Sequence, residues 1–278
     1  MHSFIRKKRN VNFLNLLLNV PILLVILTPL IYTLLISIMP ASEIYKNILI
    51  PTSIDFHNYV KAFTNPSYSF ITFIRNSFIV STAVMLGQMF TCSLAAFAFA
   101  FLDFKGRKVL FVLVLATMMV PGEATIIANY LTVSRWGWLD SYKVLIVPFL
   151  TSAMGIFLLR QNYLTFAKEL HEAARIDGCS NPRFMLSIVA PLSRPALGAL
   201  GAYVFLHTWN QYMWPLLVTN SANYRTVQVG ISMLYDIDAE ALGLMMAGVV
   251  IVIVPSLSIF IFMQKQLING LMAGAVKG

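Results

Sequence analysis

Six long apolar stretches, separated by short polar segments, make up most of this chain. Each stretch is long enough to cross the hydrocarbon core of a bilayer as a helix, which takes about 20 residues. The pattern therefore predicts an all-α, polytopic membrane protein with six transmembrane helices. The expected helices cover residues 12–38, 73–101, 109–133, 144–163, 197–218 and 241–263. Prolines inside several stretches are expected to kink these helices without excluding them from the membrane.

The composition supports this prediction and excludes an ordinary soluble domain. Hydrophobic residues make up 58% of the chain and charged residues 11%, against roughly 45–50% and about 25% in soluble proteins. The expected organisation is a basic N-terminal segment (1–11), a six-helix transmembrane domain (12–263) and a C-terminal tail (264–278). The first stretch follows a basic cluster as a signal peptide would. It is too long for a signal core and lacks a convincing cleavage site, so we expect a retained helix.

The net charge of +9 is explained by membrane topology rather than by nucleic-acid binding. If the N-terminus is cytoplasmic, 14 of the 20 Lys and Arg residues lie on the inner side and six on the outer side. This is the positive-inside bias of polytopic membrane proteins. With six helices, both termini are then expected in the cytoplasm, and nucleic acid is not an expected partner.

The sequence predicts neither a catalytic centre nor a cofactor or metal site. It contains no G-x-x-x-x-G-K-[ST] phosphate loop with which to hold ATP. Its four histidines are scattered, and its two cysteines, Cys92 and Cys179, have neither metal-ligand nor disulfide-framework spacing. We therefore expect a protein that is not an enzyme.

The polar loop 164–196, between the fourth and fifth stretches, is the most informative segment. Phe166, Leu170, Ala173 and Ala174 have helical spacing and share one face. Gly178 follows where a left-handed, helix-ending residue is favoured. Asn181 and Pro182 suit the N-cap and first position of a second helix. The loop is therefore predicted to form a helix, a tight turn and a helix.

This loop has the composition of a docking site for a soluble partner. Ala173 and Ala174 are small enough to permit close approach, Glu172 and Asp177 offer negative charge, and Arg175 could pair within the loop or across the contact. From periodicity alone, the alternative is an amphipathic helix that lies in the membrane interface.

The spacing of this loop resembles the signature loop of binding-protein-dependent ATP-binding-cassette (ABC) importer permeases. That signature has Glu-Ala-Ala, three residues, Gly, nine residues, Ile, two residues and Pro. The matching positions here are Glu172, Ala173, Ala174, Gly178, Ile188 and Pro191. Ala190 replaces the usual leucine, and Cys179 replaces a common alanine. Both departures put local packing in question more than docking.

Three further segments resemble the second permease of carbohydrate importers, the maltose-permease class. They are residues 137–142 (GWLDSY), 209–216 (WNQYMWPL) and the tail 269–278. The likeness extends from about Asn76 to the end of the chain. The 209–216 run is also very similar to that of glycerol-3-phosphate permeases.

The resemblance implies the ABC type I importer permease fold in a bacterial or archaeal cell (inner) membrane. It also implies a sister permease, a cytoplasmic ATPase dimer and an extracytoplasmic solute-binding protein as partners, besides membrane lipid. The solute would be a sugar (oligosaccharide) or glycerol-3-phosphate. The residues expected to couple the permease to the ATPase are Glu172, Ala173, Ala174, Arg175, Asp177, Gly178, Ile188 and Pro191.

Polar residues within the apolar stretches are candidates for the substrate pathway. Charged groups at this depth usually face a bundle interior or water. Glu123 is the only acidic residue inside an expected span, just after a Pro-Gly pair that favours a helix break. The other candidates are Asn129, His207, Asn210 and Gln211. The alternative for each is a hydrogen bond to a neighbouring helix.

Two other functions remain open from the residues alone. An ion-coupled secondary carrier would also have six or more spans, but should show intramembrane carboxylates or an inverted repeat. A permease of an ABC importer for a non-sugar solute would share the signature loop and differ in the 209–216 run and the tail.

Overall fold

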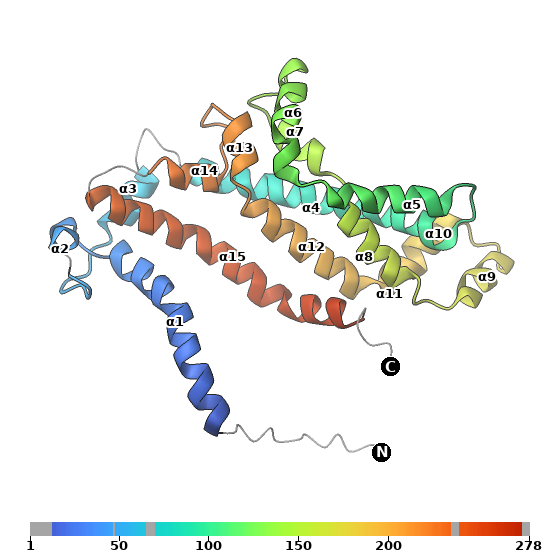
Figure 1. Cartoon of the computed structure of the whole chain (residues 1–278), viewed down its shortest axis with the longest axis horizontal. Helices are drawn as coiled ribbons and strands as arrows, with labels where there is room; N and C mark the ends of the chain where they lie inside the picture. The colour runs from blue at the N-terminus through green and yellow to red at the C-terminus, as the bar shows by residue number, and fades with distance from the viewer. Residues whose placement is uncertain (1–12, 47, 65–69, 235–238, 274–278) are drawn as a thin grey trace. The chain divides into compact units, whose positions relative to one another are not determined.

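The computed structural model describes residues 13–46, 48–64, 70–234 and 239–273, and their regular structure is entirely helical, as the sequence predicts (Figure 1). The helices are α1 (Phe13–Ser37), α2 (Ala41–Tyr45), α3 (His57–Thr64), α4 (Phe70–Phe101), α5 (Arg107–Ala116), η1 (Thr117–Met119), α6 (Gly122–Arg135), α7 (Tyr142–Ile146), η2 (Val147–Phe149), α8 (Ala153–Tyr163), α9 (Lys168–Ile176), α10 (Asn181–Phe184), η3 (Met185–Val189), α11 (Ala190–Leu192), α12 (Arg194–Trp209), α13 (Met213–Val218), α14 (Val227–Ser232) and α15 (Ala239–Ala273). The η1 and η2 segments are 3₁₀ turns, and η3 is a π-helix.

Continuous and broken helices together supply the spans. Residues 19–37, 70–101 and 242–262 lie in continuous helices that are long and apolar enough to cross a membrane. Three further pairs are bent at short breaks. The pair 107–119 and 122–135 is bent by 97°, the pair 142–149 and 153–163 by 42°, and the pair 181–192 and 194–209 by 80°. With each pair taken as one span, the described residues hold the six spans predicted.

Three of the predicted spans are not continuous helices: 109–133, 144–163, which is interrupted between η2 and α8, and 197–218. The span 109–133 breaks at Pro121, which has no amide hydrogen to continue the hydrogen-bond ladder and precedes α6 as its N-cap. The span 197–218 ends early, at Trp209. There the Asn210 side chain donates to the Leu206 carbonyl at 2.8 Å, and its backbone amide donates to the same carbonyl at 3.1 Å. Helical structure resumes at Met213.

The chain divides into two compact units, residues 1–64 with 234–250, and residues 65–233 with 251–278. In the first unit, α3 is joined to the end of α1 by hydrogen bonds. The Tyr59 hydroxyl lies 2.8 Å from the Ser37 hydroxyl, and the Asn58 side chain donates to the Ser37 carbonyl at 3.2 Å. In the same unit, the carboxylate of Glu43 accepts hydrogen bonds from the backbone and side chain of Thr52.

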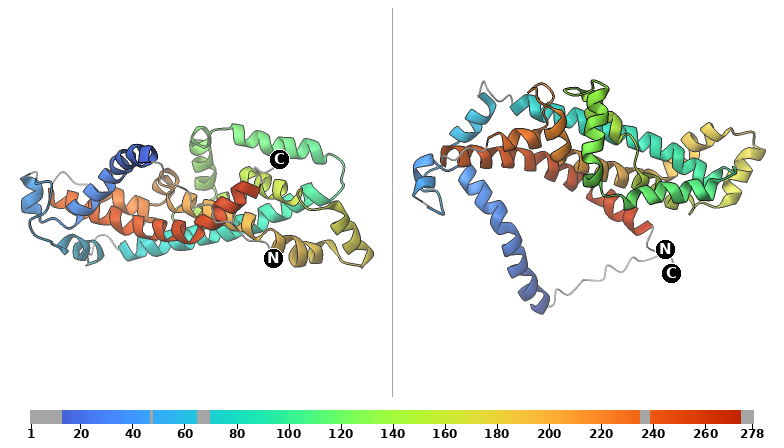
Figure 2. Two further views of the ribbon diagram at one scale, coloured as in Figure 1. Left: turned by 90° about the horizontal axis from the view of Figure 1, so that it is seen from below. Right: turned by 45° about the horizontal axis from the view of Figure 1, so that its top comes forward.

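The second unit is built on α4, which packs along α8 and α12 (Figures 1 and 2). Small residues permit this close approach, as is common between membrane helices. A Cβ atom on Gly155 of α8 would lie only 2.8 Å from the sulfur of Cys92 on α4. Gln88 adds polar contacts, because it donates to the Phe149 carbonyl and accepts from the Ser152 hydroxyl, both at 2.8 Å. The core of this unit therefore surrounds α4.

Candidate functional site

The predicted helix–turn–helix is present in residues 168–192, which we call the elbow segment. Helix α9 ends in a Schellman motif, in which the Cys179 amide donates to the Ala174 carbonyl at 2.8 Å and the Gly178 amide donates to the Arg175 carbonyl at 3.1 Å. Gly178 has φ of +74°, and a Cβ atom there would meet nothing within 4 Å. Backbone conformation, not crowding, therefore favours glycine at this position, as the sequence indicates.

The second half of the elbow segment differs from the prediction in its start and its form. Ser180, not Asn181, occupies the N-cap position of α10, so Pro182 is the second helical residue rather than the first. Helix α10 continues through the π-helical turn η3 into α11. A π-helical turn inserts an extra residue and often marks a functional site. An 80° bend then leads into α12.

Aromatic rings attach the elbow segment to the end of α4. The Phe184 ring lies 5.4 Å from the ring of Phe101 and 6.2 Å from that of Phe97. The His171 ring of α9 lies 4.8 Å from Phe184, and its Nε2 atom is 3.3 Å from Oδ1 of Asn181. These contacts join both halves of the elbow segment to one core.

Burial divides the predicted coupling residues into two groups. Ala174 is 7% exposed and belongs to the core, so of the two alanines only Ala173 is exposed at the surface of this chain. Ile188 packs partly buried against the same core. The exposed residues are Glu172, Ala173, Arg175, Asp177, Gly178 and Pro191. The two acidic groups are thus available to an external partner.

Ile176, which the sequence prediction missed, is the most exposed large apolar side chain of the elbow segment, at 86%. It is the last residue of α9 and points away from the core-facing positions of that helix. An isoleucine two residues before the helix-ending glycine, off the apolar face, was the available signal.

Glu123 and Asn129 lie on α6, beyond the 97° break. Glu123 is exposed in the first turn, which confirms that it follows a helix break. Asn129 is also exposed, and its side chain donates to the Thr125 hydroxyl at 3.5 Å. The structure therefore places both groups on the surface of the described chain.

The other three pathway candidates lie together at the end of α12. They line a hollow of about 510 Å³, formed by Tyr203, Leu206, His207, Asn210, Gln211 and Phe260. The Oδ1 atom of Asn210 accepts a hydrogen bond from the Gln228 side chain at 3.2 Å. Glu123 and Asn129 are not part of this lining. The hollow therefore presents amide, imidazole and phenol groups beside apolar surface.

Near the opposite end of α4, side-chain hydrogen bonds hold the loop that follows α13. Asn76 is fully buried, and its side chain donates to the carbonyls of Asn223 and Arg225 at 2.8 and 3.0 Å. The Tyr142 hydroxyl donates to Oδ1 of Asn76 at 2.6 Å. Asp140 accepts from the amides of Asn220 and Ser221 at 2.6 and 2.7 Å. We call these contacts the polar clasp.

Sequence reasoning recognised the 137–142 run only as a resemblance and did not predict the polar clasp. A buried asparagine in an apolar helix was the available signal, since such a group must find partners. No group of three or more metal-binding side chains occurs among the residues that the structure describes.

Comparisons with known proteins agree with this architecture. Residues 89–266 match the family described as "Binding-protein-dependent transport system inner membrane component". The arabinooligosaccharides transport system permease protein AraQ of Bacillus subtilis (strain 168) is 36% identical over 259 residues, which cover 92% of each chain. The sn-glycerol-3-phosphate transport system permease protein UgpE of Agrobacterium fabrum is 34% identical over 258 residues, covering 90% of this chain and 92% of the relative.

Solved structures match as well. A chain of a bacterial ABC transporter involved in the import of the acidic polysaccharide alginate superposes with a TM-score of 0.83 at 21% identity, covering 95% of this chain and 99% of that one. A second match, with a TM-score of 0.65 at 18% identity, covers 89% of this chain and 91% of the other. It is the bacterial alginate ABC transporter in complex with a pentasaccharide-bound periplasmic protein.

Proposed function

Because the chain belongs to the family of binding-protein-dependent transport system inner membrane components, we propose that its elbow segment transmits movement from a separate cytoplasmic ATPase to the membrane helices. The chain is a permease subunit of an ABC importer, with several membrane spans. This family membership decides against an ion-coupled secondary carrier. ATP hydrolysis belongs to the partner subunit in this proposal.

The single observation that carries the proposal is that one side of the elbow segment is exposed and the other side is buried against the helices. Glu172, Ile176 and Asp177 face outward, where a partner's basic and apolar groups can reach them. Phe184 and Val189 are 1% and 0% exposed, and fix the segment to α4 and α8. A push on the outer side is therefore passed to the packed helices, because packed interiors deform little.

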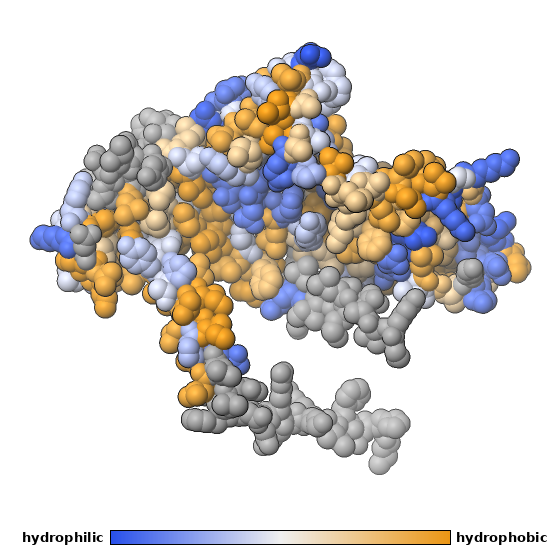
Figure 3. Space-filling model, in the orientation of Figure 1, coloured by the Kyte–Doolittle hydropathy of each residue, from blue (hydrophilic) through white to orange (hydrophobic). Residues whose placement is uncertain are grey.

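We also propose a sister permease and an extracytoplasmic solute-binding protein as partners of this permease subunit. We propose that both termini lie in the cytoplasm, an orientation supported by the positive-inside bias, which would put the basic loops and the elbow segment on the ATPase side. Exposed apolar surface on the helices, visible in orange in Figure 3, is available to a sister permease and to lipid. An extracytoplasmic solute-binding protein would deliver the solute at the opposite side of the membrane.

We place part of the solute path at the hollow lined by Tyr203, His207, Asn210 and Gln211. Amide and imidazole groups bind hydroxyl groups, and a tyrosine ring offers a flat apolar face for a sugar ring. Among the residues that the structure describes, no Lys or Arg lines the hollow, which favours a neutral oligosaccharide, as in the AraQ relatives. Glycerol-3-phosphate, the solute in the name of the UgpE relatives, is the second candidate. Glu123 and Asn129 stay proposed pathway groups at the broken helix.

Crosslinking tests the coupling role directly. In a Cys179→Ser background, Ile176→Cys should form a crosslink to the co-expressed ATPase with a short bifunctional reagent. Asn220→Cys, exposed in the loop at the other end of α4, is the control and should form none. Capture of the ATPase by both sites equally, or by neither, would count against the proposal.

Uptake assays test the solute separately. Membranes holding the complete transporter should take up a labelled arabino-oligosaccharide in preference to labelled glycerol-3-phosphate. Asn210→Ala should lower oligosaccharide uptake while ATPase crosslinking at Ile176→Cys is kept. A preference for glycerol-3-phosphate would reverse the solute assignment and leave the coupling role intact.

A further inference from the structure

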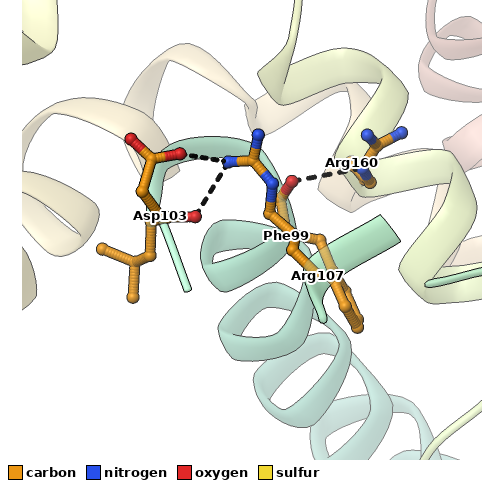
Figure 4. Close-up of polar contacts among 5 residues, drawn as sticks. Phe99, Asp103, Arg107 and Arg160 are labelled. Carbon is orange, nitrogen blue, oxygen red and sulfur yellow. Dashed lines mark hydrogen bonds and ion pairs between the residues drawn. The ribbon is translucent and has the colours of Figure 1, made fainter. Parts of the chain in front are cut away.

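A cluster of cations meets an exposed apolar helix face at the start of α5. Residues 103–109 surround a hollow of about 570 Å³ that contains Lys105, Arg107 and Lys108. Arg107 is engaged, because its Nη1 atom binds Oδ1 of Asp103 at 3.0 Å and the Leu102 carbonyl at 2.8 Å (Figure 4). Lys105 and Lys108 are exposed and form no ion pair with any described residue. The cluster therefore keeps uncompensated positive charge.

A further arginine lies next to this cluster. Arg160 of α8 donates to the Phe99 carbonyl at 3.3 Å (Figure 4). It also lies 4.0 Å from the centre of the Phe111 ring. Its cation–π contact joins α8 to α5. Against these four cations, Asp103 is the acidic side chain that lines the hollow. The local balance of charge thus favours an anionic ligand.

Helix α5 has two faces with different surroundings. Phe111 packs inward against Phe99 at 5.4 Å between ring centres. On the other face, Val109, Val112 and Leu113 are 63%, 62% and 57% exposed. These three positions have the i, i+3, i+4 spacing of one helix face. Figure 3 shows the apolar surface over α5 beside hydrophilic surface at its right end.

The lysines and the apolar face are continuous. Lys108 lies one helical turn before Val112, and Val109 itself lines the hollow. A molecule that covers both regions needs a negative group at the hollow and an apolar part of at least two helical turns. An anionic phospholipid has this form, whereas inorganic phosphate would leave the apolar face uncovered.

We infer that the hollow at residues 103–109 and the exposed face of α5 together bind an anionic phospholipid, with its phosphate at Lys105 and Lys108 and its acyl chains along Val109, Val112 and Leu113. This site shares no residue with the elbow segment or with the lining of the hollow at His207. A bound lipid of this kind would cover the exposed face of α5, the first helix of the bent pair 107–119 and 122–135. The activity of the transporter should then depend on the anionic lipid content of the membrane.

Site-resolved lipid labelling tests the inference. The complete transporter, purified with its partner subunits, is reconstituted in phosphatidylcholine vesicles that contain a trace of photoactivatable phosphatidylglycerol or photoactivatable phosphatidylcholine. Adducts on residues 103–113 are quantified by peptide mass spectrometry. We expect more labelling by phosphatidylglycerol than by phosphatidylcholine. The Lys105→Gln/Lys108→Gln variant should lower it by at least about fivefold, the loss expected from one cation beside an anionic headgroup.

A matched double variant controls for net charge. Arg135→Gln/Lys143→Gln removes two cations elsewhere and should leave the labelling of residues 103–113 unchanged. Equal labelling by the two lipids, or an equal loss in both variants, would overturn the inference. Absence of lipid adducts from this face, with a partner subunit crosslinked there instead, would also overturn it and assign the face to a protein contact. If millimolar inorganic phosphate abolished the labelling, the apolar face would contribute nothing to binding. That result would also overturn the inference.

Discussion

At the Phe101 end of α4, aromatic rings attach the elbow segment, whereas near the Phe70 end, hydrogen bonds of the polar clasp attach the 219–227 loop. Phe184 contacts rings on α4 at 5.4 and 6.2 Å. Asn76 binds two carbonyls and one hydroxyl at distances of 2.6 to 3.0 Å. The same helix thus has two attachments of different chemistry.

The difference bears on which end can move. Hydrogen bonds weaken steeply when their angle changes, so three of them on one buried side chain fix the loop in one position. Contacts between apolar rings depend less on direction and permit small displacements at low cost. The elbow segment can therefore pivot while its packed core still passes a push to α4, whereas the loop at the other end is held in one orientation.

The largest expected effect is at the aromatic attachment. Phe184→Ala removes a ring that is 1% exposed, and truncating a buried Phe typically costs about 3–5 kcal/mol. We expect a large fall in the unfolding midpoint of the purified transporter and loss of uptake. Thermal unfolding followed by circular dichroism measures the first, and solute uptake the second.

Leu186→Ala is the matched control, since Leu186 lies two residues further along, on the π-helical turn η3, and is 68% exposed. Its unfolding midpoint should stay close to that of the wild type. Equal destabilisation by the two substitutions would mean that the aromatic core does not hold the elbow segment.

The second effect concerns the polar clasp. Asn76→Ala leaves the Tyr142 hydroxyl and the carbonyls of Asn223 and Arg225 without their partner, and an unsatisfied buried group costs about 1–3 kcal/mol. Hydrogen exchange should accelerate in the 219–227 loop and stay unchanged in the elbow segment. Asn220→Ala, which keeps the backbone hydrogen bond to Asp140, should accelerate neither. Faster exchange in the elbow segment of the Asn76 variant would remove the proposed independence of the two ends.

A smaller effect is expected from replacing glycines in left-handed backbone, and it separates loss of stability from loss of coupling to ATP hydrolysis. Gly178 and Gly137 have φ of +74° and +66°, and a Cβ atom at either position would meet nothing within 4 Å. Alanine should therefore cost about 1–2 kcal/mol at each, from the left-handed backbone alone. Only Gly178→Ala should weaken the coupling of ATP hydrolysis to uptake, because only Gly178 lies in the elbow segment.

The ratio of solute molecules imported to ATP hydrolysed measures this coupling in vesicles. Gly137→Ala should keep the wild-type ratio at a similar loss of stability. If both variants lowered the ratio equally, backbone strain anywhere in the permease would explain the effect, and the elbow segment would have no special role.

The sequence was sufficient for the helices and for the turn at Gly178, because both follow from local rules. Apolar stretches of about 20 residues predict spans, and a glycine after an amphipathic helix predicts a left-handed end. The break at Pro121 was also indicated by its Pro-Gly pair. The position of the elbow segment and the reason for its glycine therefore follow from the amino-acid sequence alone.

Contacts between distant residues could not be predicted in the same way. The burial of Ala174 depends on where α4 and α8 lie, and the periodic face that contains it also contains exposed Ala173. Asn76 meets a loop about 147 residues away along the chain, which no local pattern encodes. The same holds for the hollow at His207, whose lining includes Phe260 from α15.

The smallest expected effect is in the other compact unit. There, as in the polar clasp, hydrogen bonds to one polar side chain, Glu43, order a neighbouring segment, the one around Thr52. The Thr52 amide donates to Oε2 of Glu43 at 3.0 Å, and the Thr52 hydroxyl donates to Oε1. These hydrogen bonds from the Thr52 side chain and backbone lower the pKa of the Glu43 carboxyl.

Because the folded-state pKa of Glu43 is lowered, the contribution of these hydrogen bonds to stability is present above the ordinary glutamate pKa and is lost as the pH falls through the folded value. Hydrogen exchange at Thr52 should therefore accelerate at acidic pH, beyond the intrinsic dependence of amide exchange on pH. In Glu43→Gln, which cannot ionise, that additional acceleration should disappear, and a persistent one would show that another group orders this segment.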